Sequence, residues 1–463
     1  MTSLHHCSIS ELAPRLASGD LSAETCVEAV LSRITALDPG LHAFTLVCAE
    51  QALEQARVAD RDLCSGHLRG PLHGVPFALK DIIDVKGLPT GANSHVMNGH
   101  RATRDAWLAQ RLQRAGAILI GKLNTNEFAC GGPPEGCPHP TPLNPWNASY
   151  VTGGSSSGSA VAVAAGLVPL AIGTDTNGSI RQPAARCGIV GMKPTYGRIS
   201  RDGIFPLAPS LDHAGPMTRT VADNALALAA MAGFDANDAT SRQAAGPAVG
   251  HALDRGVAGL RVGAMRNIHL DDPETDPEQA AAYARALDGL ARAGAKIIEL
   301  KLPEPTLYTE VARALMSAEA YSVHEPWLRD RGDRYGRHSR TRLMQGALIS
   351  SADYLRAQRL RERLNQQFHA LLDQVDAVVT TACHAPHPKV DDQAAALKRH
   401  LGQALMIFNV TGLPAMVLPV GLSSEGLPLT VQVAARAFDE ATVYRVGRVI
   451  EQQACLAPWP TLR

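Results

Sequence analysis

The sequence lacks the features that mark several special classes of protein. Its 463 residues carry 44 basic and 44 acidic side chains, so there is no excess charge of the kind that binds nucleic acid or an anionic membrane. The most apolar run, residues 160–173, is too short to cross a bilayer and contains Gly166 and Pro169. The first residues have neither the basic segment nor the apolar stretch of a signal peptide. We therefore expect an ordinary globular protein that binds neither nucleic acid nor a membrane.

The cysteines form no recognisable framework. Nine of them, an odd number, are scattered along the chain without a CxxC pair, which indicates reduced thiols and a cytoplasmic location. Two segments contain both cysteine and histidine, Cys137-x-His139 and Cys383-His384-x-x-His387, but prolines interrupt each of them. We expect no metal and no organic cofactor.

Short apolar runs alternate with helical stretches along most of the chain. This alternation predicts an α/β fold in which helices cover a sheet, and the 4% of aromatic residues predicts an aliphatic core. Capping residues predict helices that start at Ser8, Ser22, Asp276 and Ser350. The strand-like runs are residues 75–79, 117–120, 168–173, 261–265, 295–300, 377–381, 415–420 and 429–434.

One polar stretch, residues 234–250, is rich in glycine and proline and is typical of a surface connection. Strand-like runs of similar character lie on both sides of it, so we expect one large domain over residues 1–463. Within it we expect a helical N-terminal part (1–65), a catalytic core (66–235) and a remainder with substrate-pocket elements (236–463).

The region 152–200 is the one that carries chemistry. It begins Gly153-Gly154-Ser155-Ser156-Ser157-Gly158-Ser159 and continues to Thr174-Asp175-Thr176-Asn177-Gly178-Ser179. A flexible linker is disfavoured because structured signals flank the run, and a phosphate-binding loop would need a lysine that is missing. A nucleophile elbow centred on Ser156 matches the spacing, but a turn and not a strand precedes it.

The same region resembles the signature of the amidase signature hydrolases. It ends Cys187-Gly188-Ile189-Val190-Gly191-Met192-Lys193-Pro194-Thr195-Tyr196-Gly197-Arg198, and segments at 74–81, 121–129 and 211–219 also look like family motifs in the expected order. The resemblance extends from about residue 21 to residue 453. It implies a mixed β-sheet covered by helices and hydrolysis of an amide C–N bond through an acyl-enzyme.

The resemblance also implies roles for individual residues. Ser179 takes the place of the family's nucleophile, Ser155 that of the relay serine, and Lys80 that of the base. The peptide bond before Ser155 is cis in the family. The resemblance places the oxyanion hole at the backbone amides of Thr176, Asn177, Gly178 and Ser179. The substrate pocket would be lined from segments 128–134, 321–327 and 408–414, with candidate residues Phe128, Ala129, Cys130, Gly131, Gly132, Tyr321 and Phe408.

The physical chemistry fits the implied triad. A serine hydroxyl is a weak nucleophile until a base removes its proton, and a lysine is a base only when it is neutral. Burial at the end of an apolar strand would lower the pKa of Lys80 by disfavouring the charged form. Ser155 can pass a proton between Ser179 and Lys80, because a hydroxyl both donates and accepts.

Asn177 departs from the family pattern, which has glycine at this position. Asparagine tolerates a positive φ better than other residues with a side chain, so it could serve the turn alone. Its amide could instead hold the second heteroatom of a urea or carbamate substrate. The sequence Asp-Thr-Asn-Gly-Ser is similar to that of 1-carboxybiuret hydrolases, which cut a urea-type bond.

The predicted function is hydrolysis of a C–N bond in a small amide or carbamate. One alternative is a urea- or carbamate-type substrate such as 1-carboxybiuret. Another is glutamine hydrolysis by the A subunit of a tRNA-dependent amidotransferase, which would need partner subunits. A homodimer or a complex with a small partner subunit is compatible with the neutral charge.

Overall fold

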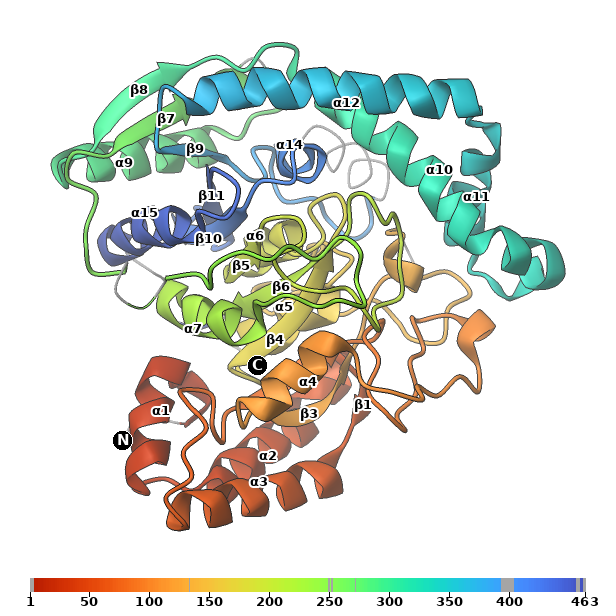
Figure 1. Cartoon of the computed structure of the whole chain (residues 1–463), viewed down its shortest axis with the longest axis vertical. Helices are drawn as coiled ribbons and strands as arrows, with labels where there is room; N and C mark the ends of the chain where they lie inside the picture. Colours follow the sequence, from red (N-terminus) through yellow and green to blue (C-terminus); the bar gives the residue numbers. More distant parts are fainter. Residues whose placement is uncertain are drawn as a thin grey trace.

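The structure is a computed structural model that describes residues 4–132, 134–248, 250, 253–270, 272–392, 404–454 and 459–460 (Figure 1). These residues form eleven strands: β1 Phe44–Val47, β2 Pro76–Lys80, β3 Ile118–Leu123, β4 Leu170–Asp175, β5 Val190–Lys193, β6 His213–Thr218, β7 Arg261–Met265, β8 Lys296–Leu300, β9 Ala377–Thr381, β10 Ala415–Leu422 and β11 Pro428–Ala435. All belong to one sheet in the order β1-β3-β2-β4-β6-β5-β10-β11-β9-β7-β8.

The sheet is mixed, as the family resemblance implies. Strands β3, β2 and β4 are parallel neighbours, and so are β9, β7 and β8. The strands between these two groups, from β4 through β6, β5, β10 and β11 to β9, pair antiparallel. Because β7, β8 and β9 follow the polar stretch 234–250 and still join this sheet, the chain folds as a single α/β domain.

Helices pack on both faces of the sheet. Those in the described part of the chain are α1 Ile9–Ser18, α2 Ala23–Leu41, α3 Ala49–Cys64, α4 Trp107–Arg114, α5 Ser157–Ala164, α6 Arg181–Cys187, α7 Val221–Met231, α8 Asn267–Leu270, α9 Pro277–Arg292, α10 Pro305–Arg331, α11 Arg337–Met344, α12 Ser351–Leu372, α14 Leu405–Val410 and α15 Glu440–Gln453. On β10, Met416 lies against Gly447 of α15, whereas the next residue, Val417, clusters with Ala185 of α6. Since successive strand residues point to opposite faces, α6 and α15 lie on opposite sides.

The helix starts predicted from capping residues are confirmed. Ser8 accepts from the Glu11 amide and completes a capping box, and Ser22, Asp276 and Ser350 each accept a backbone N–H in the first turn of their helices. Helices α1 to α3 lie together at the bottom of Figure 1, and the long helices α10 and α12 lie side by side at the top right. No helix among the described residues is long and apolar enough to span a membrane.

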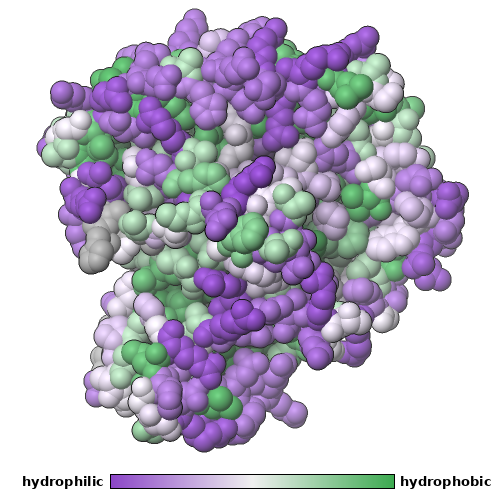
Figure 2. All heavy atoms as spheres, viewed as in Figure 1, coloured by the Kyte–Doolittle hydropathy of each residue, from purple (hydrophilic) through white to green (hydrophobic). Residues whose placement is uncertain are grey.

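The surface is mostly polar, and the core is aliphatic. In Figure 2, hydrophilic residues cover the upper part of the molecule, and paler and hydrophobic residues are scattered across the middle of this face. The buried apolar residues form one large connected cluster, dominated by alanine, valine, leucine and isoleucine, and a small second one. Strand β2 runs through this core with all five residues buried, which places its last residue, Lys80, deep in the molecule.

Candidate active site

Lys80 lies at the edge of the sheet where three parallel strands end. Its strand β2 is flanked by β3 and β4 in parallel register, so the C-terminal ends of all three meet at one edge. The Lys80 side chain has no exposed surface, and its Nζ lies 2.7 Å from Ser155 Oγ, 3.0 Å from Ser156 Oγ and 2.8 Å from Thr174 Oγ1. Three hydroxyl groups thus surround the amine.

This environment favours a neutral amine. Burial lowers the pKa of Lys80 from 10.5 to about 7, although the charges of Asp175 and Asp212 act in the opposite direction. Lys122 on the neighbouring strand is buried as fully as Lys80, but its Nζ lies 2.9 Å from the Asp81 carboxylate. Among the described residues, no carboxylate lies within 4 Å of Lys80 Nζ. A lysine in this setting can accept a proton near pH 7.

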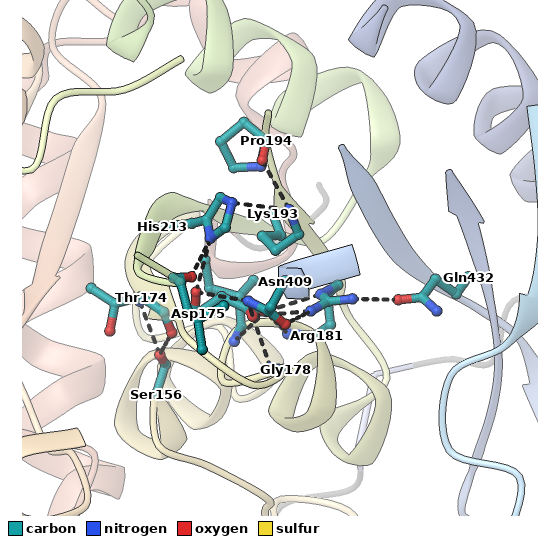
Figure 3. Close-up of polar contacts among 12 residues, drawn as sticks. Ser156, Thr174, Asp175, Gly178, Arg181, Lys193, Pro194, His213, Asn409 and Gln432 are labelled. Carbon is teal, nitrogen blue, oxygen red and sulfur yellow. Dashed lines mark hydrogen bonds and ion pairs between the residues drawn. The ribbon is translucent and has the colours of Figure 1, made fainter. Parts of the chain in front are cut away.

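The Ser156 hydroxyl is held by hydrogen bonds to the backbone. Its Oγ donates to the Thr174 carbonyl at 3.1 Å and accepts from the Thr174 amide at 3.2 Å (Figure 3). It also contacts Lys80 Nζ. The residue has no exposed surface and precedes α5 directly. This placement argues against the elbow interpretation, in which Ser156 would be the nucleophile.

Ser155 and Ser179 instead line the same cavity. The peptide bond between Gly154 and Ser155 is cis, as the family resemblance implies. Ser155 Oγ contacts Lys80, whereas Ser179 Oγ makes no hydrogen bond within the described part of the chain. The Ser179 backbone is fixed, because its carbonyl accepts the Ser156 amide at 3.2 Å. The structure therefore brings an open serine hydroxyl, a second serine and a buried lysine to one site.

The turn before Ser179 is shaped by the Asp175 carboxylate. Its Oδ1 accepts from the Gly178 amide at 2.8 Å, and its Oδ2 accepts from the Ile180 amide at 3.1 Å. Gly178 has φ of 98°, and a Cβ there would come within 2.7 Å of Leu405, so both the conformation and the space require glycine.

Two sequence expectations about this turn need correction. The Gly178 amide was expected in the oxyanion hole, but it donates to Asp175 and is engaged within the turn. Asn177 was considered for a left-handed conformation, but the positive φ belongs to Gly178 and not to Asn177. The amides of Thr176, Asn177 and Ser179 remain candidates for binding an oxyanion.

Residues from the C-terminal part of the chain hold Asp175 in place. Burial alone would raise the pKa of its carboxyl, but the charge and hydrogen bonds of Arg181 hold that pKa below its usual range. Arg181 also donates to Asn409 Oδ1 at 2.6 Å and to Gln432 Oε1 at 2.8 Å (Figure 3). Asn409 completes the network by donating to Asp175 Oδ1 at 2.8 Å.

A buried lysine and histidine lie behind this network. Lys193 Nζ is 3.2 Å from His213 Nε2 and donates to the carbonyl of Pro194 (Figure 3). It also donates to the carbonyl of Leu413. Burial lowers the pKa of both Lys193 and His213 well below their ordinary values. Neither residue lines the cavity that contains Ser179; His213 lines the second, adjoining cavity, and its Nδ1 lies 3.2 Å from the Asp175 carbonyl oxygen at the start of the turn.

The cavity in front of Ser179 has a volume of about 380 Å³. A second cavity of about 340 Å³ adjoins it through the shared residues Ala129, Thr176 and Leu207. Of the residues expected from sequence, the first cavity is lined by Ala129, Cys130, Gly131, Gly132, Ser155, Thr176, Asn177 and Ser179. It is also lined by residues that the sequence did not single out for substrate contact, among them Gln182, Arg186, Met316 and Arg342.

Three expected wall residues lie elsewhere among the described residues. Phe128 packs edge-on against His324 at 4.6 Å, inside an aromatic cluster. Phe408 is fully buried and packs edge-on against Phe368 at 5.7 Å, and Tyr321 is half-buried on α10 without reaching the cavity. Large rings at these positions contribute to the core, so the small residues of 129–132 are left to line the cavity.

The candidate metal ligands are separated. His384 Nε2 lies 2.7 Å from Asp272 Oδ2, and His387 Nε2 lies 3.0 Å from the Pro428 carbonyl. No group of three or more potential ligands comes together within the residues that the structure describes.

Several residues of the site gave only weak signals in the sequence. Thr174 could have been inferred, because it ends the apolar strand just before Asp175. Met316 and Asn409 reach the turn from 139 and 234 residues away, and nothing in their local sequence marks them. Arg342 lies in an arginine-rich segment that is typical of a solvated helix face.

Comparison with known proteins identifies the family of this chain. The Amidase family matches residues 25–444. The chain is 39% identical to the A subunit of the glutamyl-tRNA(Gln) amidotransferase from Chloroflexus aurantiacus, over 100% of this chain and 99% of that protein.

Solved structures give the same result. A vestigial protein complex that reveals the origins of an s-triazine catabolic enzyme contains a chain with 32% identity and a TM-score of 0.90, covering 98% of this chain and 100% of that one. The peptide amidase of Stenotrophomonas maltophilia has 31% identity and a TM-score of 0.85, with 99% of each chain covered. This chain belongs to the amidase signature family and is a hydrolase that acts on C–N bonds.

Proposed function

We propose that the chain hydrolyses the C–N bond of a small amide-type substrate that carries an anionic group, with Ser179 as nucleophile, Ser155 as relay and Lys80 as base. One observation carries the proposal: a lysine whose pKa is lowered to about 7 contacts Ser155, and Ser155 and the open Ser179 hydroxyl line one cavity. A relay between a buried amine and a second serine is the arrangement that activates a hydroxyl without histidine.

The reaction follows from these positions. Neutral Lys80 takes a proton from Ser155, Ser155 takes one from Ser179, and Ser179 Oγ attacks the substrate carbonyl. The amides of Thr176, Asn177 and Ser179 are available to stabilise the oxyanion. The C–N bond then breaks as Ser155 returns a proton to the leaving nitrogen, which leaves an acyl group on Ser179. Water attacks this ester in the same way and restores the serine.

Arg342 supports the anionic group of the substrate. This residue is partly buried in the cavity wall, next to Gly131, and none of the described carboxylates lies within 4 Å of its guanidinium group. A partly buried arginine without an acidic partner favours a ligand that carries a carboxylate. Carboxylate-bearing ureas, such as 1-carboxybiuret, and glutamine all satisfy this requirement.

Glutamine hydrolysis is the second candidate, and the 39% identity to amidotransferase A subunits favours it. It predicts that the isolated chain hydrolyses glutamine slowly and needs a partner subunit for full activity. Under this candidate function, the active form is therefore a complex with a small partner subunit or with a second copy of the chain. Size-exclusion chromatography and glutaminase assays of the purified chain test it directly.

The experiment for the main proposal pairs a substrate panel with two arginine variants. Purified protein is assayed with carboxylate-bearing ureas, carbamates and amides and with their neutral amide or methyl ester analogues. We expect Arg342→Met to raise KM for the anionic substrates about tenfold or more, as for the loss of one charged hydrogen bond of about 2 kcal/mol. The matched control Arg340→Met alters an exposed residue outside the cavity and should change little.

Covalent trapping tests the nucleophile. A fluorophosphonate should label Ser179, and Ser179→Ala should abolish both labelling and turnover. A label on Ser156 would overturn the assignment and restore the elbow interpretation.

A further inference from the structure

The side chain of Asn177 has a polar atom without a partner in the wall of the substrate cavity. The residue is 4% exposed, lines the cavity and lies two positions before Ser179. Its Nδ2 donates to Met316 Sδ at 2.9 Å. Its Oδ1 is buried, and no described residue donates a hydrogen bond to it. Buried polar atoms are normally paired, so this oxygen calls for an explanation.

The backbone does not require an asparagine at this position. The positive φ of the turn belongs to Gly178, and the turn is held by Asp175 through the amides of Gly178 and Ile180. None of these contacts uses the Asn177 side chain. A structural role in the turn therefore leaves the buried amide unexplained.

Met316 fixes which end of the Asn177 amide is free. A thioether sulfur accepts weakly and cannot donate, so the NH₂ group faces the sulfur and the carbonyl oxygen faces away from it. Met316 comes from α10 and also lines the cavity. The pair thus presents a hydrogen-bond acceptor close to the nucleophile, and a substrate donor is the missing partner.

We infer that Asn177 Oδ1 accepts a hydrogen bond from an N–H on the acyl side of the scissile carbonyl, and that the preferred substrate is therefore of the urea type. A urea has nitrogen on both sides of its carbonyl, so one nitrogen leaves and the other can donate to Asn177. A carboxamide has carbon at that position, and a carbamate ester that loses its amine has oxygen. Neither of them satisfies an acceptor, so Asn177 is a specificity-determining residue for ureas.

This inference rests on the proposed function, and the test separates the two. Three matched compounds share a carboxylate and a leaving NH₂ group but differ beside the carbonyl: X–NH–CO–NH₂, X–N(CH₃)–CO–NH₂ and X–CH₂–CO–NH₂. For each, kcat/KM is measured, together with the protection it gives Ser179 against fluorophosphonate labelling. Protection reports binding even where turnover is slow.

In the wild type we expect the N–H compound to exceed both isosteres at least tenfold in kcat/KM or in protection. In Asn177→Gly the ratio of the N–H compound to each isostere should fall to near one. Met316→Leu keeps the volume but removes the acceptor that orients the amide, and it should reduce the ratio two- to fivefold. Asn98→Gly alters an exposed asparagine and should leave the ratio unchanged.

The outcomes are distinguishable. A wild type that handles the N–H and CH₂ compounds equally, or an Asn177→Gly variant that retains the full ratio, overturns the inference about Asn177. Either result leaves the proposed function intact as long as fluorophosphonate labels Ser179. Absence of that label, in contrast, refutes the proposed nucleophile.

Discussion

The state of Lys80 makes the pH profile of the reaction the most direct test of the proposed triad. The amine has no exposed surface, and burial lowers its pKa from 10.5 to about 7. Only the neutral form can take a proton from Ser155, so kcat/KM should fall as the pH is lowered through 7. An ordinary lysine would be neutral in only about 0.03% of molecules at pH 7, against about half for a pKa near 7.

The expected size of the effect follows from the same pKa. Between pH 7 and pH 5 the neutral fraction falls about fiftyfold, and kcat/KM should fall by the same factor. Initial rates are measured from pH 5 to 9 at constant ionic strength with a substrate that does not titrate in this range. Return of each sample to pH 7 with full recovery of activity excludes unfolding as the cause.

Two variants assign the acidic limb to Lys80. The charge of Asp212 raises the pKa of Lys80, so Asp212→Asn should move the limb to lower pH. Asp330→Asn, the same change at an exposed carboxylate outside both cavities, should leave the limb in place. A wild-type profile that is flat from pH 5.5 to 8.5, or a limb that moves to higher pH in Asp212→Asn, would refute the reasoning.

The remaining predictions concern the same site. Lys80→Met should abolish turnover yet raise the free energy of unfolding at pH 7 by about 2 kcal/mol, since the cost of holding a lysine at a lowered pKa exceeds its three hydrogen bonds. This cost is fully present below pH 7 and disappears as the pH rises from 7 towards 10.5. In urea denaturation, the difference in the free energy of unfolding between Lys80→Met and the wild type should therefore shrink over that range. Asn409→Leu should lower the free energy of unfolding by about 2–4 kcal/mol and reduce kcat, because it leaves Asp175 and Arg181 incompletely paired, as denaturation and steady-state assays will show. Dialysis against EDTA should leave kcat unchanged, because Lys80 and Ser155 supply the proton transfer; a loss that zinc or magnesium restores would contradict the triad.

The strands could be predicted where they are aliphatic and long enough. All eight apolar runs became strands, and 261–265 and 377–381 match β7 and β9 to the residue. Strands β1, β5 and β6 were missed. β1 and β5 have only four residues each, and β6 contains Gly215 and Pro216, which are unfavourable inside a strand. Pairing with neighbours on both sides of β6 overrides its poor local propensity.

The site could be predicted only as far as its motifs reach. The positions of Lys80, Ser155 and Ser179 followed from the family resemblance, whereas the residues that surround them come from distant segments without a motif. Arg361 and Arg342 show this limit, because each lies in an arginine-rich segment of the kind that usually forms a solvated helix face. In the structure Arg361 donates to the Val410 and Ser210 carbonyls, and Arg342 lines the cavity. Periodicity identifies a helix face, but tertiary packing decides what covers it.

The contacts of Arg181 have a consequence for how the enzyme is made. Its partners Asn409 and Gln432 follow it by 228 and 251 positions in the chain. A ribosome therefore synthesises Ser179, the proposed nucleophile, long before the residues that complete the turn around it. A chain that stalls before residue 409 carries Ser179 but lacks two of the side chains that hold Asp175 and Arg181 in place. Hydrolytic activity should then appear only near the end of translation, and truncated chains should have no hydrolytic activity.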